Sequence, residues 1–155
     1  MKAWNGPQTI YVTYIVTTAE KLWAALTSAE FTRQYFFGRR IESDWKTGAM
    51  VRYWQKDGTL DVEGTILECD PHRRVSFTWH VMWIEEYRNL PEALVTFQLD
   101  SLGEVVRLTM TEAHDESIHE KLLEGGRKGW PVILSGLKSL LETGRALPKF
   151  DPFQP

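Results

Sequence analysis

The chain has 155 residues, a formal net charge of −3 and a single cysteine. One domain of this length buries enough surface to fold without disulfides, and Cys69, having no partner, favours a reducing, cytoplasmic location. The charges are mixed and contain no basic run, which argues against a nucleic-acid-binding surface. No apolar stretch is long enough to span a bilayer. The composition is unusual in its seven tryptophans, seven phenylalanines and five tyrosines, because so much aromatic area must fill a thick core or line a cavity.

Hydrophobic periodicity predicts, in chain order, one strand, two short helices, six strands and a long helix. The first strand covers residues 9–17, and Thr17 or Thr18 can cap the helix that follows it. A second short helix begins near Ser28 and ends at Gly38. The six predicted strands lie at residues 40–43, 50–55, 60–68, 75–83, 95–99 and 106–110.

The last element is an amphipathic helix predicted over residues 129–144, with Pro131 in its first turn and Gly144 just past its end. A separate helical stretch is expected from Glu116, capped by Asp115, and the three glycines at 125, 126 and 129 predict a kink or break between the two. This order predicts an α+β fold in which an antiparallel sheet wraps round a long C-terminal helix. The whole chain, 1–155, is expected to form one domain, with its core at about 9–144 and an irregular tail at 145–155.

Several short motifs occur in a fixed order along most of the chain. They are Thr17 with Trp23 and Leu26, Phe36-Phe37 before Gly38, Glu42 through Gly48, Gly64 through Asp70-Pro71 to Trp79, and Gly129-Trp130 followed by Leu134, Leu137, Leu141 and Glu142. In this order and spacing they resemble the SRPBCC (START-like) superfamily, whose helix-grip fold is shared by the birch pollen allergen. More narrowly, the chain resembles the bacterial single-domain proteins named as homologues of the activator of heat-shock protein 90 ATPase.

This resemblance implies a helix-grip fold with a cavity between the long helix and the concave sheet, which other members of the superfamily use for lipids, hormones and polyketides. It implies no particular chemistry, because the shared motifs are mainly structural. Eight residues are candidates for lining the cavity: Trp79, Trp83, Phe97, Trp130, Phe36, Tyr53, Glu63 and Gly126. The three tryptophans can equally well line a pocket or fill the core, whereas the core is favoured for Phe97. Gly126 would leave room near the start of the helix.

No catalytic residue, metal ligand or cofactor is predicted. Asp61 and Glu63 share one face of a predicted strand and could act as general acid and base if one were desolvated, but strand acids usually form a solvated outer face. The four histidines lack metal-ligand spacing, and Cys69 is expected to be a small core residue. There is no glycine-rich phosphate loop of the required strand-to-helix form.

Three functions remain open. The favoured one is a module that binds a small hydrophobic molecule without necessarily converting it, and an open, mostly apolar cavity would support it. The second is a cyclase- or hydrolase-type enzyme using Tyr53, Glu63 or His80, which a buried carboxylate or histidine in a closed cavity would support. The third is a domain that contacts a heat-shock protein 90 chaperone or forms a homodimer, which a large exposed apolar patch would support.

Overall fold

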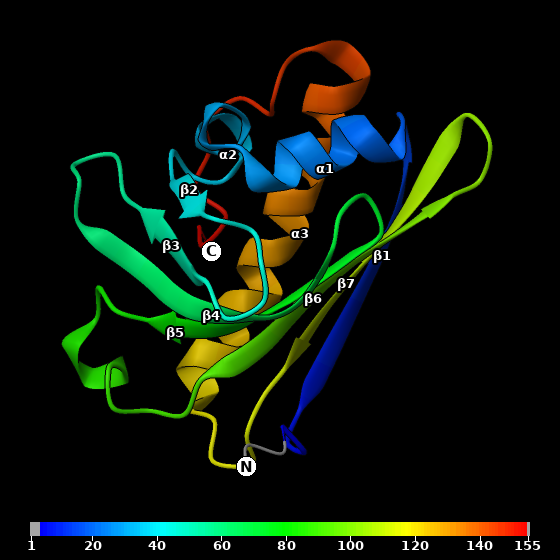
Figure 1. The fold of residues 1–155 in the computed structure, drawn as a ribbon. Helices are drawn as coiled ribbons and strands as arrows, with labels where there is room; N and C mark the ends of the chain where they lie inside the picture. The colour runs from blue at the N-terminus through cyan, green and yellow to red at the C-terminus, as the bar shows by residue number, and fades with distance from the viewer. Residues whose placement is uncertain (1–3, 155) are drawn as a thin grey trace.

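A seven-stranded antiparallel sheet curves round one long helix in the computed structural model, which describes residues 4–154 (Figure 1). The strands are β1 (Gln8–Val16), β2 (Arg40–Ser43), β3 (Met50–Trp54), β4 (Leu60–Asp70), β5 (Arg74–Val81), β6 (Ala93–Ser101) and β7 (Val105–Ala113). The helices are α1 (Ala19–Thr27), α2 (Ala29–Tyr35), the single 3₁₀ turn η1 (Glu85–Tyr87) and α3 (Glu120–Thr143).

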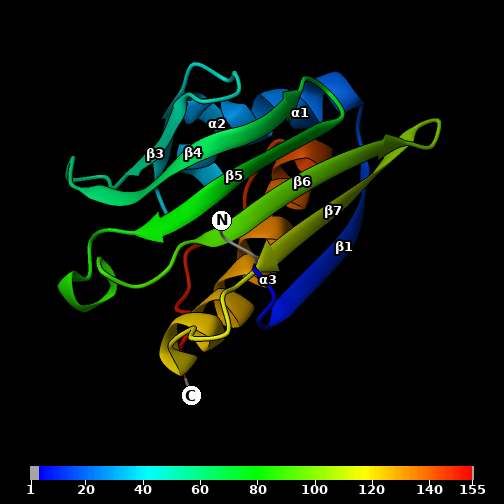
Figure 2. The ribbon, with the colours of Figure 1, turned by 60° about the horizontal axis from the view of Figure 1, so that its bottom comes forward.

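The strand order in the sheet is β1-β7-β6-β5-β4-β3-β2. The six predicted strands, β2 to β7, therefore form a meander in which each strand pairs with the next. Strand β1 forms the other edge of the sheet and pairs along its whole length with β7. Figure 2 shows these strands side by side above α3. The α+β helix-grip class is confirmed, since an antiparallel sheet packs one face on a long C-terminal helix.

Helix α3 is continuous, so the predicted kink or break at its glycines is wrong. It begins after His119, whose Nδ1 accepts a hydrogen bond from the Lys121 backbone N–H at 3.1 Å, rather than after Asp115. Pro131 consequently lies inside the helix and not in its first turn, where its missing N–H removes one bond of the helical ladder. Gly144 ends the helix as predicted, with a φ of 84° in the left-handed region.

Helices α1 and α2 pack beside the C-terminal half of α3 (Figure 1). Thr18 caps α1 by accepting a hydrogen bond from the Lys21 N–H at 3.2 Å. The buried Tyr35 hydroxyl donates to the Ala25 carbonyl at 2.7 Å, which ties α2 to α1. Gly136 lets α3 approach this pair closely, because a Cβ at that position would lie only 3.3 Å from the Tyr35 Cβ.

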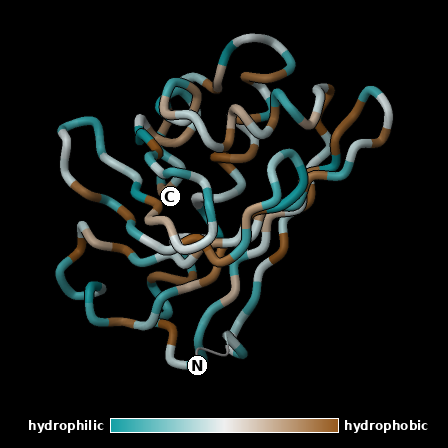
Figure 3. The backbone as a smooth tube through the Cα atoms, viewed as in Figure 1, coloured by the Kyte–Doolittle hydropathy of each residue, from teal (hydrophilic) through white to brown (hydrophobic). Residues whose placement is uncertain are grey.

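Aromatic rings fill the space between the sheet and α3. Their centroids lie 4.8 to 6.2 Å apart, and the rings belong to Phe36, Tyr53, Phe77, Trp79, Phe97 and Trp130. Apolar segments of the tube in Figure 3 recur along the strands and α3, whereas the β3–β4 turn is hydrophilic. Among the helices of residues 4–154, none is both long and apolar enough to cross a membrane.

Candidate functional site

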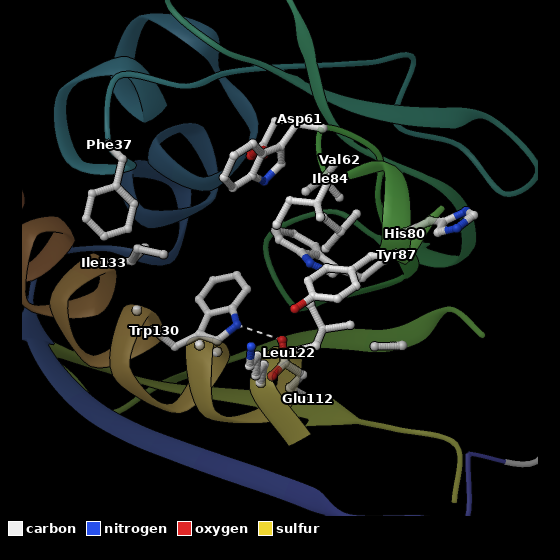
Figure 4. Close-up of a pocket in the computed structure, with 18 of the residues that line it drawn as sticks. Phe37, Asp61, Val62, His80, Ile84, Tyr87, Glu112, Leu122, Trp130 and Ile133 are labelled. Carbon is white, nitrogen blue, oxygen red and sulfur yellow. Dashed lines mark hydrogen bonds between the residues drawn. The ribbon is translucent and has the colours of Figure 1, made fainter. Parts of the chain in front are cut away.

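A cavity of about 510 Å³ lies between the N-terminal half of α3 and the facing ends of β4 to β7, and it is open to solvent on one side. Figure 4 shows Trp130 and Glu112 on one side of it and Asp61 and Ile84 on the opposite side. Its lining is mostly apolar and includes Phe36, Phe37, Val62, Trp79, Trp83, Ile84, Tyr87, Ile118, Leu122, Trp130, Ile133 and Phe153.

Aromatic side chains form the walls and the rim. Trp79 and Trp130 have ring centroids 5.2 Å apart, and Phe36 meets Trp130 edge-on at 5.5 Å. Trp83 and Phe37 are exposed at the rim. The cavity therefore offers rigid, flat apolar surfaces to a ligand that enters from this side.

The polar side of the cavity is formed by Glu112 and His114 at the end of β7, each only 3 % exposed. One carboxylate oxygen of Glu112, Oε2, accepts a hydrogen bond from the Trp130 indole Nε1 at 2.7 Å, drawn in Figure 4. The other, Oε1, lies 3.1 Å from His114 Nε2. His114 Nδ1 is buried and has no hydrogen-bond partner among the described residues. Both carboxylate oxygens of Glu112 therefore have a partner, whereas one of the two imidazole nitrogens of His114 has none.

The Glu112 carboxylate fits beside α3 because Gly126 has no side chain. A Cβ on Gly126 would lie 2.5 Å from Glu112 Oε1, whereas Cβ atoms on Gly125 and Gly129 would meet nothing within 4 Å. Tyr11, on the inner face of β1, lies near the same carboxylate. Burial, and then the negative charge of Glu112, raise the pKa of Tyr11 from 10.0 to about 12.

A second buried carboxyl, that of Asp61, lines the opposite side and pairs with Arg39. Burial raises the pKa of Asp61, and the Arg39 guanidinium opposes that shift. Asp61 is the extra residue of a β-bulge, since Leu60 lies opposite Trp54 and Val62 lies opposite Tyr53. The bulge breaks the alternation of side chains along β4, which explains why Asp61 is buried although Glu63 is not.

Five of the eight candidate residues line the cavity: Phe36, Trp79, Trp83, Gly126 and Trp130. The other three do not. Phe97 packs behind Trp130, and Tyr53 packs behind Trp79. Both are buried in the core, because Trp130 and Trp79 lie between them and the cavity. Glu63 lies opposite Arg52 on β3 and pairs with it at 3.5 Å.

His80 was considered as a catalytic group, and it does line the cavity. Its imidazole points away from the centre, however (Figure 4). The residues that sequence reasoning missed are Glu112 and His114. The sequence does contain a signal for them. Every second side chain of β7 points inward, as Leu108 and Met110 do, and the same alternation extended along the chain reaches positions 112 and 114.

Comparisons with known proteins identify the family. The family model described as Activator of Hsp90 ATPase homolog 1-like protein matches residues 16–142. No curated protein matches the sequence.

Several solved structures share the fold. Protein MLL2253 from Mesorhizobium loti is 20% identical, with a TM-score of 0.74 over 87% of this chain and 96% of that one. The Aha1 dimer from Colwellia psychrerythraea is 18% identical, with a TM-score of 0.70 over 90% and 99%. DynU16, described as a putative protein in the dynemicin biosynthetic locus, is 21% identical, with a TM-score of 0.73 over 90% of this chain and 48% of that one. At these identities the likeness establishes the fold.

Proposed function

The chain belongs to the family of Activator of Hsp90 ATPase homolog 1-like proteins, and from this membership and the cavity beside α3 we propose that it binds a small hydrophobic molecule there. The observation that carries the proposal is a cavity of about 510 Å³ with aromatic walls and few polar groups, the usual composition of a small-molecule site. The fold likeness to DynU16 supports it, since that protein is described as part of a biosynthetic locus. The free thiol of Cys69 supports a cytoplasmic location.

The walls favour a ligand with flat rings, which can stack between Trp79, Trp83 and Trp130. His114 Nδ1 is buried without a hydrogen-bond partner among the described residues, which costs about 1–3 kcal/mol. We therefore propose that the ligand also carries a hydroxyl group that reaches this nitrogen, because a hydroxyl can donate to it or accept from it whichever tautomer is present. The cavity is open to solvent, and both carboxylate oxygens of Glu112 are already engaged by Trp130 and His114, so we propose binding without conversion of the ligand.

Isothermal titration calorimetry with 2-naphthol tests this proposal. We expect micromolar affinity, about −8 kcal/mol, with a negative heat-capacity change on binding. Gly125→Leu should abolish uptake, since a side chain there grows into open space. Ser135→Leu is the matched control, because it adds the same side chain at an exposed position of the same helix. A wild-type protein that takes up no 2-naphthol, or a Gly125→Leu variant that binds normally, would refute the proposal.

A second candidate function is association with another copy of the chain. The outer face of β1 carries four apolar side chains that are 51 to 61% exposed: Ile10, Val12, Tyr14 and Val16. This strand holds no charge, proline or bulge, three of the devices that keep edge strands from associating. Among the described residues, α3 covers its backbone only near the end, where Glu142 and Lys138 bond to Val16 and Tyr14. The dimeric state of the Colwellia psychrerythraea relative supports the idea.

Sedimentation velocity tests this second candidate. The wild type should sediment as a dimer and Val12→Lys as a monomer, because a charge would be desolvated in the interface. Leu67→Lys, at an exposed position on β4, should leave the dimer intact. A wild type that stays monomeric at about 100 μM would rule out this second candidate. If the wild type instead binds a purified heat-shock protein 90 chaperone, the four exposed apolar side chains of β1 would be assigned to that partner.

A further inference from the structure

A second concave surface lies on the other side of Phe37, the only residue that it shares with the hydrophobic cavity. It is a groove of about 660 Å³ between α2, the start of β2, the β3–β4 turn and the C-terminal tail. We call it the basic groove. Its lining residues are Arg33, Gln34, Tyr35, Phe37, Gly38, Arg40, Lys56, Val132, Gly136, Ala146, Leu147, Pro148, Lys149 and Phe150.

Four of these side chains are cationic and none is acidic: the cations are Arg33, Arg40, Lys56 and Lys149. None of the four side chains forms an ion pair or a hydrogen bond with another described residue. Arg39, Arg52, Arg74 and Arg107, by contrast, are all paired with acids. A groove lined by one sign of charge concentrates ligands of the opposite sign.

Most of the groove is held in place by secondary structure. Arg33 lies on α2, which the Tyr35 hydroxyl anchors to α1, and Arg40 is the first residue of β2. Lys56 lies across from the loop before β2, since a Cβ on Gly38 would be 4.0 Å from its Cβ. Only Lys149 comes from the irregular tail, which runs past α2 in Figure 1. The backbone positions of Arg33 and Arg40 are therefore fixed before any ligand arrives.

Each cation has an ordinary explanation when taken alone. Arg33 is in the last turn of α2, where a positive charge stabilises the helix end, and Lys56 sits in a hydrophilic turn (Figure 3). These explanations do not account for four unpaired cations from four separate segments that line one groove without an acid among them.

We propose that the basic groove binds the phosphate groups of a soluble small molecule. Two guanidinium groups and two ammonium groups suit an anion with two or more charges and several acceptor oxygens, and the arginine fork matches phosphate geometry. Phe37 and Phe150, both exposed, offer apolar surface to the rest of such a molecule. The concave shape fits a single small molecule better than it fits a flat membrane surface.

Isothermal titration calorimetry with inorganic pyrophosphate at low ionic strength tests the site. Pyrophosphate has no apolar part that could stack on the aromatic walls of the hydrophobic cavity, and the Gly125→Leu variant, which fills that cavity, should bind it normally whether or not the proposed function holds. We expect saturable binding that weakens about tenfold in Arg40→Gln and is lost in the Arg33→Gln/Arg40→Gln double variant. Raising NaCl from about 20 to 200 mM should weaken it further.

Arg73→Gln is the matched control, because Arg73 is an exposed arginine in the β4–β5 turn, paired with Asp70 outside the groove. It should bind pyrophosphate like the wild type. The inference is overturned if the folded wild type shows no saturable binding, or if Arg73→Gln loses as much affinity as Arg40→Gln. Sedimentation with phosphatidic acid vesicles in the absence of pyrophosphate binding would likewise overturn it, by assigning the cations to a lipid headgroup.

Discussion

Trp130 and Glu112 are joined by a hydrogen bond of 2.7 Å from the indole Nε1 to the carboxylate Oε2, which links the middle of α3 to β7. The same two side chains line the hydrophobic cavity. Trp130 is also buried against Phe36, Trp79 and Phe97. It therefore serves as both core residue and cavity wall, two roles that the sequence presented as alternatives.

Replacing Trp130 should separate its packing from its hydrogen bond. We expect Trp130→Ala to lower the free energy of unfolding by about 3–5 kcal/mol, as for other large buried aromatics. Trp130→Phe keeps most of the apolar contact but removes one donor from a buried carboxylate, and it should cost about 1–3 kcal/mol. Urea denaturation measures both, and an unchanged midpoint for Trp130→Ala would show that the side chain is not part of the core.

Adjacent glycines of α3 should respond in opposite directions to the same substitution. Gly126→Ala places a Cβ 2.5 Å from Glu112 Oε1 and must displace a buried carboxylate, so we expect destabilisation of about 1–3 kcal/mol. Gly125→Ala meets nothing within 4 Å and should stabilise the helix by about 0.5–1 kcal/mol. Thermal melts of the two variants provide the comparison, and equal shifts would contradict the tight fit of Glu112 against Gly126.

Tyr11 should make stability fall at alkaline pH. Its pKa is raised to about 12 in the folded protein, whereas an unfolded tyrosine titrates near 10. Between these values the folded state holds the proton more tightly, so the free energy of unfolding decreases as pH rises. The stability of wild type relative to Tyr11→Phe should therefore drop from pH 9 to pH 11 in urea melts.

Glu112→Gln provides the control for this titration. It removes the negative charge that helps to raise the Tyr11 pKa, so absorbance titration should show that pKa moving back toward 10. A Tyr11 pKa that stays near 12 in this variant would show that burial, the larger of the two causes, accounts for the whole shift.

Ending the chain at Leu147 should leave the fold intact. Residues 148–154 form no helix or strand, and Phe150 and Phe153 are exposed, so we expect a change in unfolding free energy within about 0.5 kcal/mol. Binding of 2-naphthol should weaken, because Phe153 lines the hydrophobic cavity. Circular dichroism and calorimetry test the two statements, and a truncated protein that fails to fold would show that the tail is structural.

The strand order could be predicted because period-two alternation is a local property, and each strand of the meander pairs with the next. The position at which α3 starts could not be predicted from the sequence. Its three glycines weaken the helix locally, and contacts distant in sequence, such as that of Trp130 with Glu112, stabilise the segment in addition to the His119 cap. Gly144 could be predicted because a left-handed helix end favours glycine irrespective of its surroundings.

The site was harder to predict than the fold. Aromatic residues on the inner face of neighbouring strands, such as Trp79 on β5 and Phe97 on β6, were expected to point toward the same interior, but their depth within the core decides that Trp79 lines the cavity and Phe97 does not. The side chain of Asp61 points inward because of a β-bulge, and no residue type at that place in the sequence indicates a bulge. Glu112 and His114 could have been found by extending the β7 alternation past its apolar residues.

The most direct test of the central claim, that the cavity beside α3 binds a small hydrophobic molecule, is to follow the indole N–H signals of the protein by nuclear magnetic resonance while 2-naphthol is added. We expect saturable shifts for Trp79, Trp83 and Trp130, which line the cavity, and no shifts for Trp23 and Trp54, which do not. Unchanged signals from the three lining tryptophans at saturating probe, or shifts confined to Trp23 and Trp54, would contradict it.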